Sequence, residues 1–336
     1  MNGQLALFPD SAVQETSRRT RGRTSERLKR LDLESEIRDR ILPLCRLRYG
    51  EVWEDPVKGH RVGMLDASKS DDVGKIVAGE KTPLIVNDPP YNVKVGNANT
   101  RNLPKTSLES YLDFSRKWVS NAMAIMAANA HFYIWMGTDY KDNFQPLPDF
   151  MIMMRDFRQL KPRNLITMRN QRGYGTQKNW MWVRQELLYY VKGNPDFSVV
   201  YTDIPKVLKG YYKVVNGRLT ENLERSKSDT IRPGNVWFDI QQVFYRMEEN
   251  VSGCYAQKPL KAIDRIIESS SKKGELVVDF FAHSGTTLIA GEKLGRRVYT
   301  FDIDPIFTEI TIRRLENHRK TGRTGWQWRN PFPEID

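Results

Sequence analysis

Short apolar runs alternate with segments of helical periodicity along most of the chain, and this alternation constrains the fold more than any other feature of the sequence. The apolar runs predict strands at 61–65, 84–87, 130–136, 164–168, 186–191, 275–279 and 297–301. The periodic segments predict helices or helical turns at 71–77, 107–128, 149–159, 260–269, 286–294 and 307–318. Strands that alternate with helices indicate an α/β fold, in which crossover helices cover the faces of one sheet.

The N-terminal part of the chain, residues 1–58, precedes this pattern. Its first 24 residues are polar, and four basic residues cluster there: Arg18, Arg19, Arg21 and Arg23. They predict a mobile arm, which is either a solvated charge run or a segment that grips phosphates. A helix with Ser25 as its N-cap is expected next, ending or kinking near Pro43.

Residues 193–250 interrupt the alternation in the middle of the chain. Gly, Asn, Pro and Lys are frequent there, with tyrosines placed among basic residues. We interpret this stretch as an inserted subdomain. It separates residues 59–192 from residues 251–320, and a loose C-terminal tail is expected after residue 320.

The charge balance favours a polyanionic partner. Lys and Arg number 53 against 41 Asp and Glu, which gives a net charge of +12. Nucleic acid is the simplest such partner, although a merely basic protein would show the same excess. The mean hydropathy is −0.60, the first residues do not resemble a secretory signal, and Cys45 and Cys254 suggest neither a disulfide framework nor a metal site. We therefore expect a cytoplasmic protein with no membrane segment and no metal.

The stretch VNDPPYNV, residues 86–93, places Asp88, Pro89, Pro90 and Tyr91 directly after an apolar strand. The prolines fix the backbone and leave the Pro89 carbonyl free. The Asp88 carboxylate and that carbonyl can accept hydrogen bonds from the two hydrogens of one amine, while Tyr91 offers a flat face for a base. The alternative is a plain turn in which Asp88 is a cap and Tyr91 a filler.

A second chemical stretch, VVDFFAHSGTT, runs from Val277 to Thr287. A strand ends at Asp279 and leads through small residues into a helix, while the next strand is followed by Asp302. Strand ends of this kind form a ligand crevice, and an acid after the second strand commonly holds a ribose. The pair indicates a cofactor that contains adenosine. The dinucleotide pattern G-x-G-x-x-G is missing, which argues against NAD.

These motifs, together with Gln257-Lys258-Pro259 upstream of the second stretch, resemble the amino-group DNA methyltransferases of the β arrangement. The resemblance covers most of residues 60–318 and implies a Rossmann-like, circularly permuted methyltransferase sheet. The catalytic half would be 59–192, the target-recognition region 193–250 and the cofactor half 251–320. The strand ending at Asp66 would join the sheet beside the strand ending at Asp302.

The resemblance also implies roles for individual residues. S-adenosyl-L-methionine would be the cofactor, and Asp88 in the first motif position favours adenine N6 over cytosine N4. A base flipped out of double-stranded DNA would stack on Tyr91. Residues around the methionine part would be Asp279, Phe281, Ala282, Ser284 and Thr286. Lys258 would face the cofactor carboxylate, Asp302 the ribose and Asp66 the adenine.

Some alternatives stay open. His283 stands where the family's turn has glycine, so the imidazole could crowd the cofactor and mark a DNA-binding subunit without turnover. A cytosine-N4 methyltransferase is the other alternative. The loops at 94–107 and 169–180 are expected to contact DNA. Restriction–modification or regulation are both compatible roles, with a second copy or a cognate endonuclease as partner.

Overall fold

The computed structural model describes residues 31, 34–90, 108–137, 145–174, 178, 180–206, 212–221, 228–327 and 329–335. The expected arm and the helix cap at Ser25 lie outside these residues, as do Tyr91 and the whole loop at 94–107. Among the described residues, no helix is long and apolar enough to cross a membrane.

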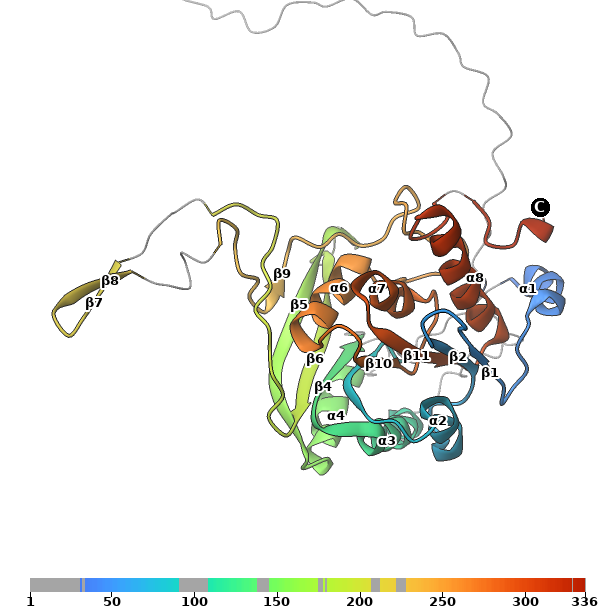
Figure 1. Ribbon diagram of the computed structural model, residues 1–336, viewed down its shortest axis with the longest axis horizontal. Helices are drawn as coiled ribbons and strands as arrows, with labels where there is room; N and C mark the ends of the chain where they lie inside the picture. Colours follow the sequence, from blue (N-terminus) through green and yellow to red (C-terminus); the bar gives the residue numbers. More distant parts are fainter. Residues whose placement is uncertain are drawn as a thin grey trace, which may run out of the picture.

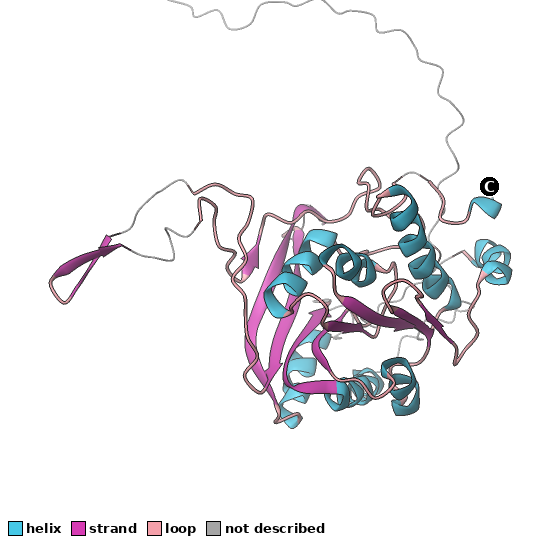
Figure 2. Cartoon of the chain, in the orientation of Figure 1, coloured by secondary structure: helices cyan, strands magenta, loops and turns pink. Residues whose placement is uncertain are grey.

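A nine-stranded mixed sheet forms the centre of the molecule (Figures 1 and 2). Its order is β1-β2-β11-β10-β3-β4-β6-β5-β9. The strands are β1 (Val52–Glu54), β2 (Arg61–Met64), β3 (Thr82–Asn87), β4 (Met126–Met136), β5 (Leu160–Tyr174), β6 (Trp182–Lys192), β9 (Val236–Trp237), β10 (Leu276–Asp279) and β11 (Arg297–Asp302). Strands β2, β11, β10, β3 and β4 are parallel, and β6 runs antiparallel to both β4 and β5.

The sheet closes only by combining strands from both ends of the chain. β10 pairs with β3, so that Val277 lies opposite Leu84, and β11 pairs with β2, so that Asp302 lies opposite Met64. The expected permuted methyltransferase sheet is therefore confirmed. Because these strands are parallel, their carboxyl ends meet at one edge, where Asp88 and Asp279 follow their strands.

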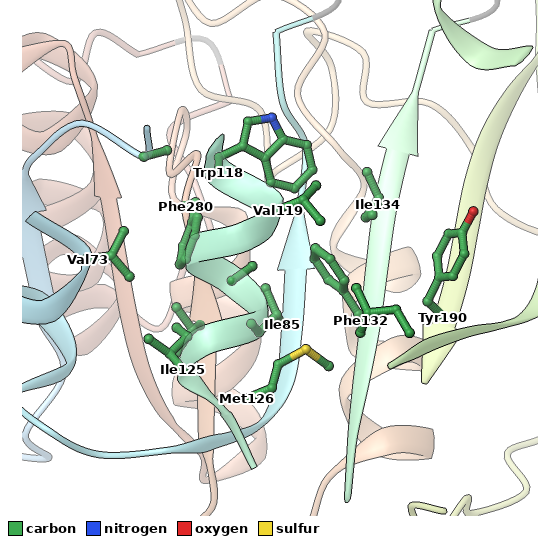
Figure 3. Packing of buried hydrophobic residues seen from close by; sticks show 14 of the residues in the cluster. Val73, Ile85, Trp118, Val119, Ile125, Met126, Phe132, Ile134, Tyr190 and Phe280 are labelled. Atoms are coloured by element: carbon green, nitrogen blue, oxygen red, sulfur yellow. The ribbon is translucent and has the colours of Figure 1, made fainter. Parts of the chain in front are cut away.

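One face of the sheet is covered by α2 (Ser70–Val77), α3 (Leu108–Ile125) and α4 (Pro146–Met153) (Figure 1). In α3 the apolar residues recur at helical spacing, so that Trp118, Val119 and Ile125 point at the sheet. Figure 3 shows them against Ile85 of β3 and Phe132 of β4. This layer buries large aromatic side chains between α3 and the face of the sheet.

The other face is covered by α6 (Leu260–Ser270), α7 (Thr286–Leu294) and α8 (Pro305–Thr321) (Figures 1 and 2). Their apolar side chains form a second buried cluster with the opposite faces of the same strands. Asp304 caps α8 by accepting a hydrogen bond from the amide of Ile306, and Pro305 occupies the first turn. Both layers therefore hold the strand ends rigidly.

Three sequence expectations need correction. The helix expected at 149–159 is α4, followed by a 3-10 turn at Met154–Asp156, and β5 starts already at Leu160. The helix expected at 107–128 ends at Ile125, because β4 begins directly after it. The strand expected at 164–168 continues to Tyr174, since its pairing with β6 extends that far.

The C-terminal tail is not loose over its described part. Phe332 is fully buried and packs with Ile41 of α1 (Ser35–Ile41) and with Ile310 of α8. The Arg313 guanidinium lies 4.6 Å from the centre of the Phe332 ring. The tail therefore closes a third apolar cluster on the outer side of α8.

The region 193–250 contributes a hairpin and one strand of the main sheet. β7 (Tyr212–Val215) and β8 (Arg218–Glu221) form their own two-stranded sheet (Figure 1). Asn216 and Gly217, at φ values of 52° and 74°, form the turn between them, as an Asn-Gly hairpin requires. β9 then pairs with β5 in the main sheet.

Candidate functional site

The ends of β3 and β10 open into one cavity at the carboxyl edge of the sheet. The cavity is lined by Val86, Asp88, Trp135, Lys258, Ile263, Asp279, Phe281, Ala282, His283, Ser284, Thr286 and Thr287. Residues of the DPPY stretch and of the turn after Asp279 thus share one space, although they come from opposite halves of the chain. This confirms that the two stretches meet.

Asn87 connects the two strand ends directly. Its side chain is fully buried, and its Oδ1 accepts a hydrogen bond of 3.0 Å from the backbone amide of Phe280. Side chains alternate along a strand, so Asn87 faces α3 while Asp88 faces the cavity on the α6 side. Asn87 was not among the residues predicted from the sequence. The available signal was an amide residue between an apolar strand and the rigid Pro-Pro corner.

Lys258 lies against Asp88. Its Nζ is 2.7 Å from Asp88 Oδ2 and 5.4 Å from the centre of the Trp135 ring. Only 7% of the Lys258 side chain is exposed, against 24% for Asp88. Lys258 was expected to face a cofactor carboxylate, whereas the structure pairs it with a carboxylate of the protein itself.

The segment before α6 holds Lys258 in this position. The Gln257 side chain accepts from the amide of Val251 at 3.0 Å and donates to the carbonyl of Glu249 at 2.7 Å. The Glu249 carboxylate accepts from the amide of Leu260 at 2.7 Å and so caps α6. Burial raises the pKa of Glu249 above its usual range. These contacts fix the backbone on both sides of Lys258.

Asp279 is a buried carboxylate at the bottom of the cavity. It accepts hydrogen bonds from the Phe281 amide, at 2.9 Å, and from the Thr287 hydroxyl. Burial raises the pKa of Asp279 to about 7 despite these bonds, and the negative charge of Asp88 raises it further. The cavity therefore contains an acceptor that gains from a positively charged ligand group.

Gly285 shapes the turn that follows. Its φ is +73°, and a Cβ at this position would lie 3.0 Å from the Cα of Thr311 in α8. Only glycine fits both the left-handed backbone and this close approach. The turn therefore presses α7 against α8 and leaves Ser284 and Thr286 at the cavity wall.

Asp302 ends the neighbouring strand β11. Its carboxylate accepts from the amides of His283 and Asp304, each at 3.0 Å. Burial raises the pKa of Asp302 to about 7, and Asp304 and Asp279 add to the rise. Asp302 thus fixes the turn at His283 and keeps an acceptor at the edge of the sheet.

His283 adopts a left-handed backbone with a φ of 43°, as the glycine at this position in related turns suggested. The centre of its ring is 4.7 Å from that of Phe307 in α8. The imidazole therefore packs on the helix, while the residue still contributes to the cavity wall.

Arg314 supports the turn from behind. It is fully buried in α8, and its guanidinium donates to the carbonyl of Ser284 at 2.7 Å and to the hydroxyl of Thr286 at 3.1 Å. It also donates to the carbonyls of Glu249 and Thr324. Burial lowers the pKa of Arg314 to about 10. Nothing in the local sequence distinguished this arginine from the partly buried Arg313 and Arg319 of the same helix.

Asp66 follows β2 at the same edge but does not line the cavity. Its carboxylate accepts from the amide and the hydroxyl of Ser68, at 2.8 and 2.7 Å. The amide of Leu65 donates to the carbonyl of Asp302, which places Asp66 beside the end of β11. Asp66 is therefore near Asp302 and two strands away from Asp279.

The β5–β6 hairpin extends beyond the carboxyl edge of the parallel strands. Asn87, the last residue of β3, pairs with Ile134 of β4, and Ile134 pairs with Leu188 of β6. From Leu188 the hairpin continues for six more residues, to the pair Tyr174–Trp182. Six residues of strand correspond to roughly 20 Å. Near the tip, 92% of Trp180 is exposed. The described part of the loop expected at 169–180 is therefore mostly strand that overhangs the site.

A larger cavity lies between α6, the sheet and the region 193–250. It is lined by Tyr133, Asn164, Ile166, Tyr189, Phe197, Val200, Tyr201, Lys206, Ile231, Arg232, Pro233, Gly234, Asn235, Trp237, Arg265, Ile266 and Ser269. Neither Asp88 nor the turn after Asp279 belongs to it. Size alone would favour this cavity as the site, but the convergent acids and the buried lysine lie in the smaller one.

Known proteins match most of the chain. The N6/N4 methyltransferase family model, described as DNA methylase, matches residues 82–313. The chain belongs to this DNA methylase family. Type II methyltransferase M.BamHI of Bacillus amyloliquefaciens is 28% identical over 258 residues, which cover 73% of this chain and 55% of that protein. Type II methyltransferase M.HpaI of Haemophilus parainfluenzae is 26% identical over 70% of this chain and 68% of its own length.

The fold of this DNA methylase also matches a solved structure. The M1.HpyAVI–SAM complex is 14% identical, with a TM-score of 0.52, and the match covers 76% of this chain and 98% of that one. The likeness supports the permuted sheet. The chain spans about half the length of M.BamHI, so that relative contains segments beyond the matched region.

Proposed function

We propose that this DNA methylase transfers a methyl group from S-adenosyl-L-methionine to the N6 amine of adenine at specific sites in double-stranded DNA. The observation that carries the proposal is the cavity shared by Asp88 and the turn after Asp279. One wall offers acceptors for an amine, and the other offers acceptors for a cofactor with cationic and hydroxyl groups. The net charge of +12 suits a DNA substrate.

Asp88 and the carbonyl of Pro89 act on the target amine in this proposal. The lone pair of an exocyclic amine is delocalised into the base, so the nitrogen is a weak nucleophile. Two acceptors at its hydrogens favour a more pyramidal nitrogen and orient its lone pair. Asp88 is also placed to take the proton that the nitrogen loses. The base must leave the DNA stack to reach the cavity, and Tyr91 would stack on it.

The cavity residues fit the proposed cofactor. Gly285 gives the turn its left-handed backbone and its close packing on α8, and the buried Asp279 supplies a carboxylate that a ligand ammonium group would stabilise. Phe281, Ala282, Ser284 and Thr286 would surround the methionine part. Lys258 would bind the carboxylate, Asp302 the ribose and Asp66 the adenine side. When bound, S-adenosylmethionine supplies an electrophilic methyl group on a positively charged sulfur.

The choice of adenine rests on Asp88. In the family that the motif resembles, Asp at this position goes mostly with adenine N6 and Ser with cytosine N4. The family model itself covers both amines. Identification of the modified nucleoside therefore decides between N6-methyladenine and N4-methylcytosine.

The test is incubation of the purified chain with labelled S-adenosylmethionine and unmethylated plasmid DNA, followed by digestion and nucleoside analysis. We expect labelled N6-methyladenine from the wild type and none above background from Asp88→Ala. Cofactor binding by Asp88→Ala serves as the folding control. Full activity of Asp88→Ala would overturn the assignment of Asp88.

A DNA-binding subunit without turnover is the second candidate, and the left-handed backbone of His283 is the observation that favours it. The ring position against Phe307 argues for an open cavity instead. Equilibrium binding of S-adenosylmethionine, measured beside methyl transfer, separates the two. DNA binding without cofactor binding would support the inactive subunit.

A further inference from the structure

The ion pair between Lys258 and Asp88 joins the two halves of the site. The ammonium group of Lys258 lies 2.7 Å from Asp88 Oδ2 and partly neutralises the carboxylate, which makes Asp88 a weaker acceptor for a target amine. A charged donor at this distance forms a stronger hydrogen bond than a neutral amine does. The amine of the target adenine would therefore compete poorly with Lys258 for this carboxylate.

Lys258 has little freedom to leave the cavity. Only 7% of its side chain is exposed, the Trp135 ring lies next to its ammonium group, and the flanking Gln257 is tied on both sides. A buried ammonium that loses its anion without replacement would be strongly unfavourable. An anion that enters the same cavity can take the place of Asp88 beside Lys258 and keep the lysine charge neutralised.

We propose that Lys258 is a positioning residue that makes Asp88 available only when the cofactor is bound. This rests on the function proposed above. The carboxylate of the cofactor's methionine part is the anion that replaces Asp88 as the partner of Lys258. The exchange keeps the lysine charge neutralised and frees Asp88 Oδ2 for the target amine. Cofactor binding thus precedes productive capture of the base.

The exchange assigns Lys258 two successive partners. If Lys258 only bound the cofactor, its replacement would lower cofactor affinity alone. If Lys258 stayed on Asp88 throughout, its replacement would change the transfer rate alone. The exchange predicts a different result, namely that removal of the ammonium uncouples capture of the base from the presence of cofactor.

The experiment uses a duplex with 2-aminopurine at the target adenine, after the methylated position has been mapped on plasmid DNA. Fluorescence reports base extrusion with no ligand, with S-adenosylhomocysteine, and with decarboxylated S-adenosylmethionine. For the wild type we expect at least a fivefold rise with S-adenosylhomocysteine and little rise with the decarboxylated compound, which lacks the anion. Lys258→Met is expected to extrude the base without any ligand.

Two further variants complete the design. Lys258→Met should bind S-adenosylhomocysteine about 10- to 100-fold more weakly, because a charge-assisted contact is lost, and Lys258→Arg should restore part of the ligand dependence. Lys261→Met is the matched control. Lys261 lies in the first turn of α6, is largely exposed and pairs with Asp203 outside the cavity. It should behave as the wild type.

Three results would overturn the proposal. One is an equal rise with the decarboxylated and the intact ligand in the wild type. The second is unchanged ligand dependence in Lys258→Met. The third is a Lys258→Met variant with normal ligand affinity and slow transfer, since Lys258 would then remain on Asp88. Failure of the proposed function is recognised separately, because the wild type would then yield no methylated nucleoside at all.

Discussion

The guanidinium of Arg314 donates to the carbonyl of Ser284 at 2.7 Å, deep between α7 and α8. The same side chain reaches the carbonyls of Glu249 and Thr324. One arginine therefore joins the cofactor-side turn, the segment before α6 and the chain after α8. The geometry of the site depends on this residue although it touches neither proposed substrate.

Arg314→Met should destabilise the protein by about 3 kcal/mol, since it leaves several buried carbonyl groups without donors. Cofactor affinity should fall at least tenfold in the remaining folded protein, because the turn at Ser284 loses its support. Urea unfolding and equilibrium binding measure the two effects. Arg323→Lys, at an exposed position, is the control and should change neither. Normal cofactor affinity in Arg314→Met would show that the turn at Ser284 keeps its conformation without the arginine.

Asp279→Asn should abolish tight cofactor binding and at the same time stabilise the protein at alkaline pH. The pKa of Asp279 is raised from 3.8 to about 7, so the folded state holds this proton more tightly than the unfolded state. The stability this group contributes is present below pH 4 and is lost as the pH rises through about 7. A shift of this size corresponds to at most about 4 kcal/mol.

The comparison for Asp279→Asn is thermal unfolding at pH 5 and at pH 8.5. The gain over the wild type should appear at pH 8.5 and shrink at pH 5, where the wild-type carboxyl is protonated. A gain of equal size at both pH values would point to packing instead of charge.

Cofactor affinity should increase with pH between about 6 and 8. Asp279 and Asp302 both have pKa values raised to about 7 by burial, and the ionised carboxylates are the better acceptors for ammonium and hydroxyl groups. Binding should therefore release protons near pH 7, which calorimetry in buffers of different ionisation enthalpy detects. In Asp302→Asn the proton release should become smaller. Proton uptake on binding would contradict the assignment.

The permuted sheet was implied by the family resemblance. The meeting of the two motif stretches could be predicted, because parallel strands bring their carboxyl ends to one edge whatever the side chains are. The hydrogen bonds that support the site from behind could not be predicted from the sequence. Asn87 and Arg314 act through neighbours that tertiary packing brings to them from far along the chain. The position of Lys258 in the sequence does not determine whether it pairs with the Asp88 carboxylate or with the carboxylate of the cofactor.

The ends of some helices and strands, and the packing of the C-terminal tail, also depend on tertiary contacts that the local sequence does not predict. The end of α3 at Ile125 and the early start of β5 at Leu160 depend on strand pairing across the sheet. Phe332 stands in a short polar tail with no periodicity, and the cavity it fills between α1 and α8 is a property of the assembled fold. Local secondary-structure propensity therefore does not predict that Phe332 is buried.

A charged network at the opposite edge of the sheet should govern acid stability. Arg319 binds both oxygens of Asp55, at 2.7 and 2.8 Å, and also contacts Glu292, which binds His60. The amide of Val298 donates to Nδ1 of His60, so Nε2 carries the proton that Glu292 accepts. Burial alone would raise the pKa of Glu292, but the bonds from Arg319, His60 and Lys58 outweigh it and lower the value to about 2.

Because the pKa values of Glu292 and Asp55 are lowered in the folded state, their contribution is complete above about pH 4.5 and is lost as the pH falls toward 2. Arg319→Met should destabilise the protein by about 3 kcal/mol at pH 7 and move acid unfolding to higher pH. Circular dichroism during acid titration checks this, with Lys320→Met as the exposed control. An unchanged acid midpoint would show that the network contributes little.

His283→Gly should leave cofactor affinity within about threefold of the wild type. The ring lies on Phe307, so its removal opens little space, and glycine accepts the φ of 43° without strain. The relief of strain and the lost ring contact are of similar size, so stability should change by less than about 1 kcal/mol. Calorimetric binding and thermal unfolding measure both.

Phe307→Ala provides the informative counterpart to His283→Gly. Without Phe307 the imidazole loses its packing surface and gains access to the cavity wall that it already borders. We expect weaker cofactor binding in Phe307→Ala and recovery in the double variant Phe307→Ala/His283→Gly. If His283→Gly alone binds cofactor more than tenfold more tightly than the wild type, the imidazole obstructs the site in the native protein, and the inactive-subunit interpretation gains support.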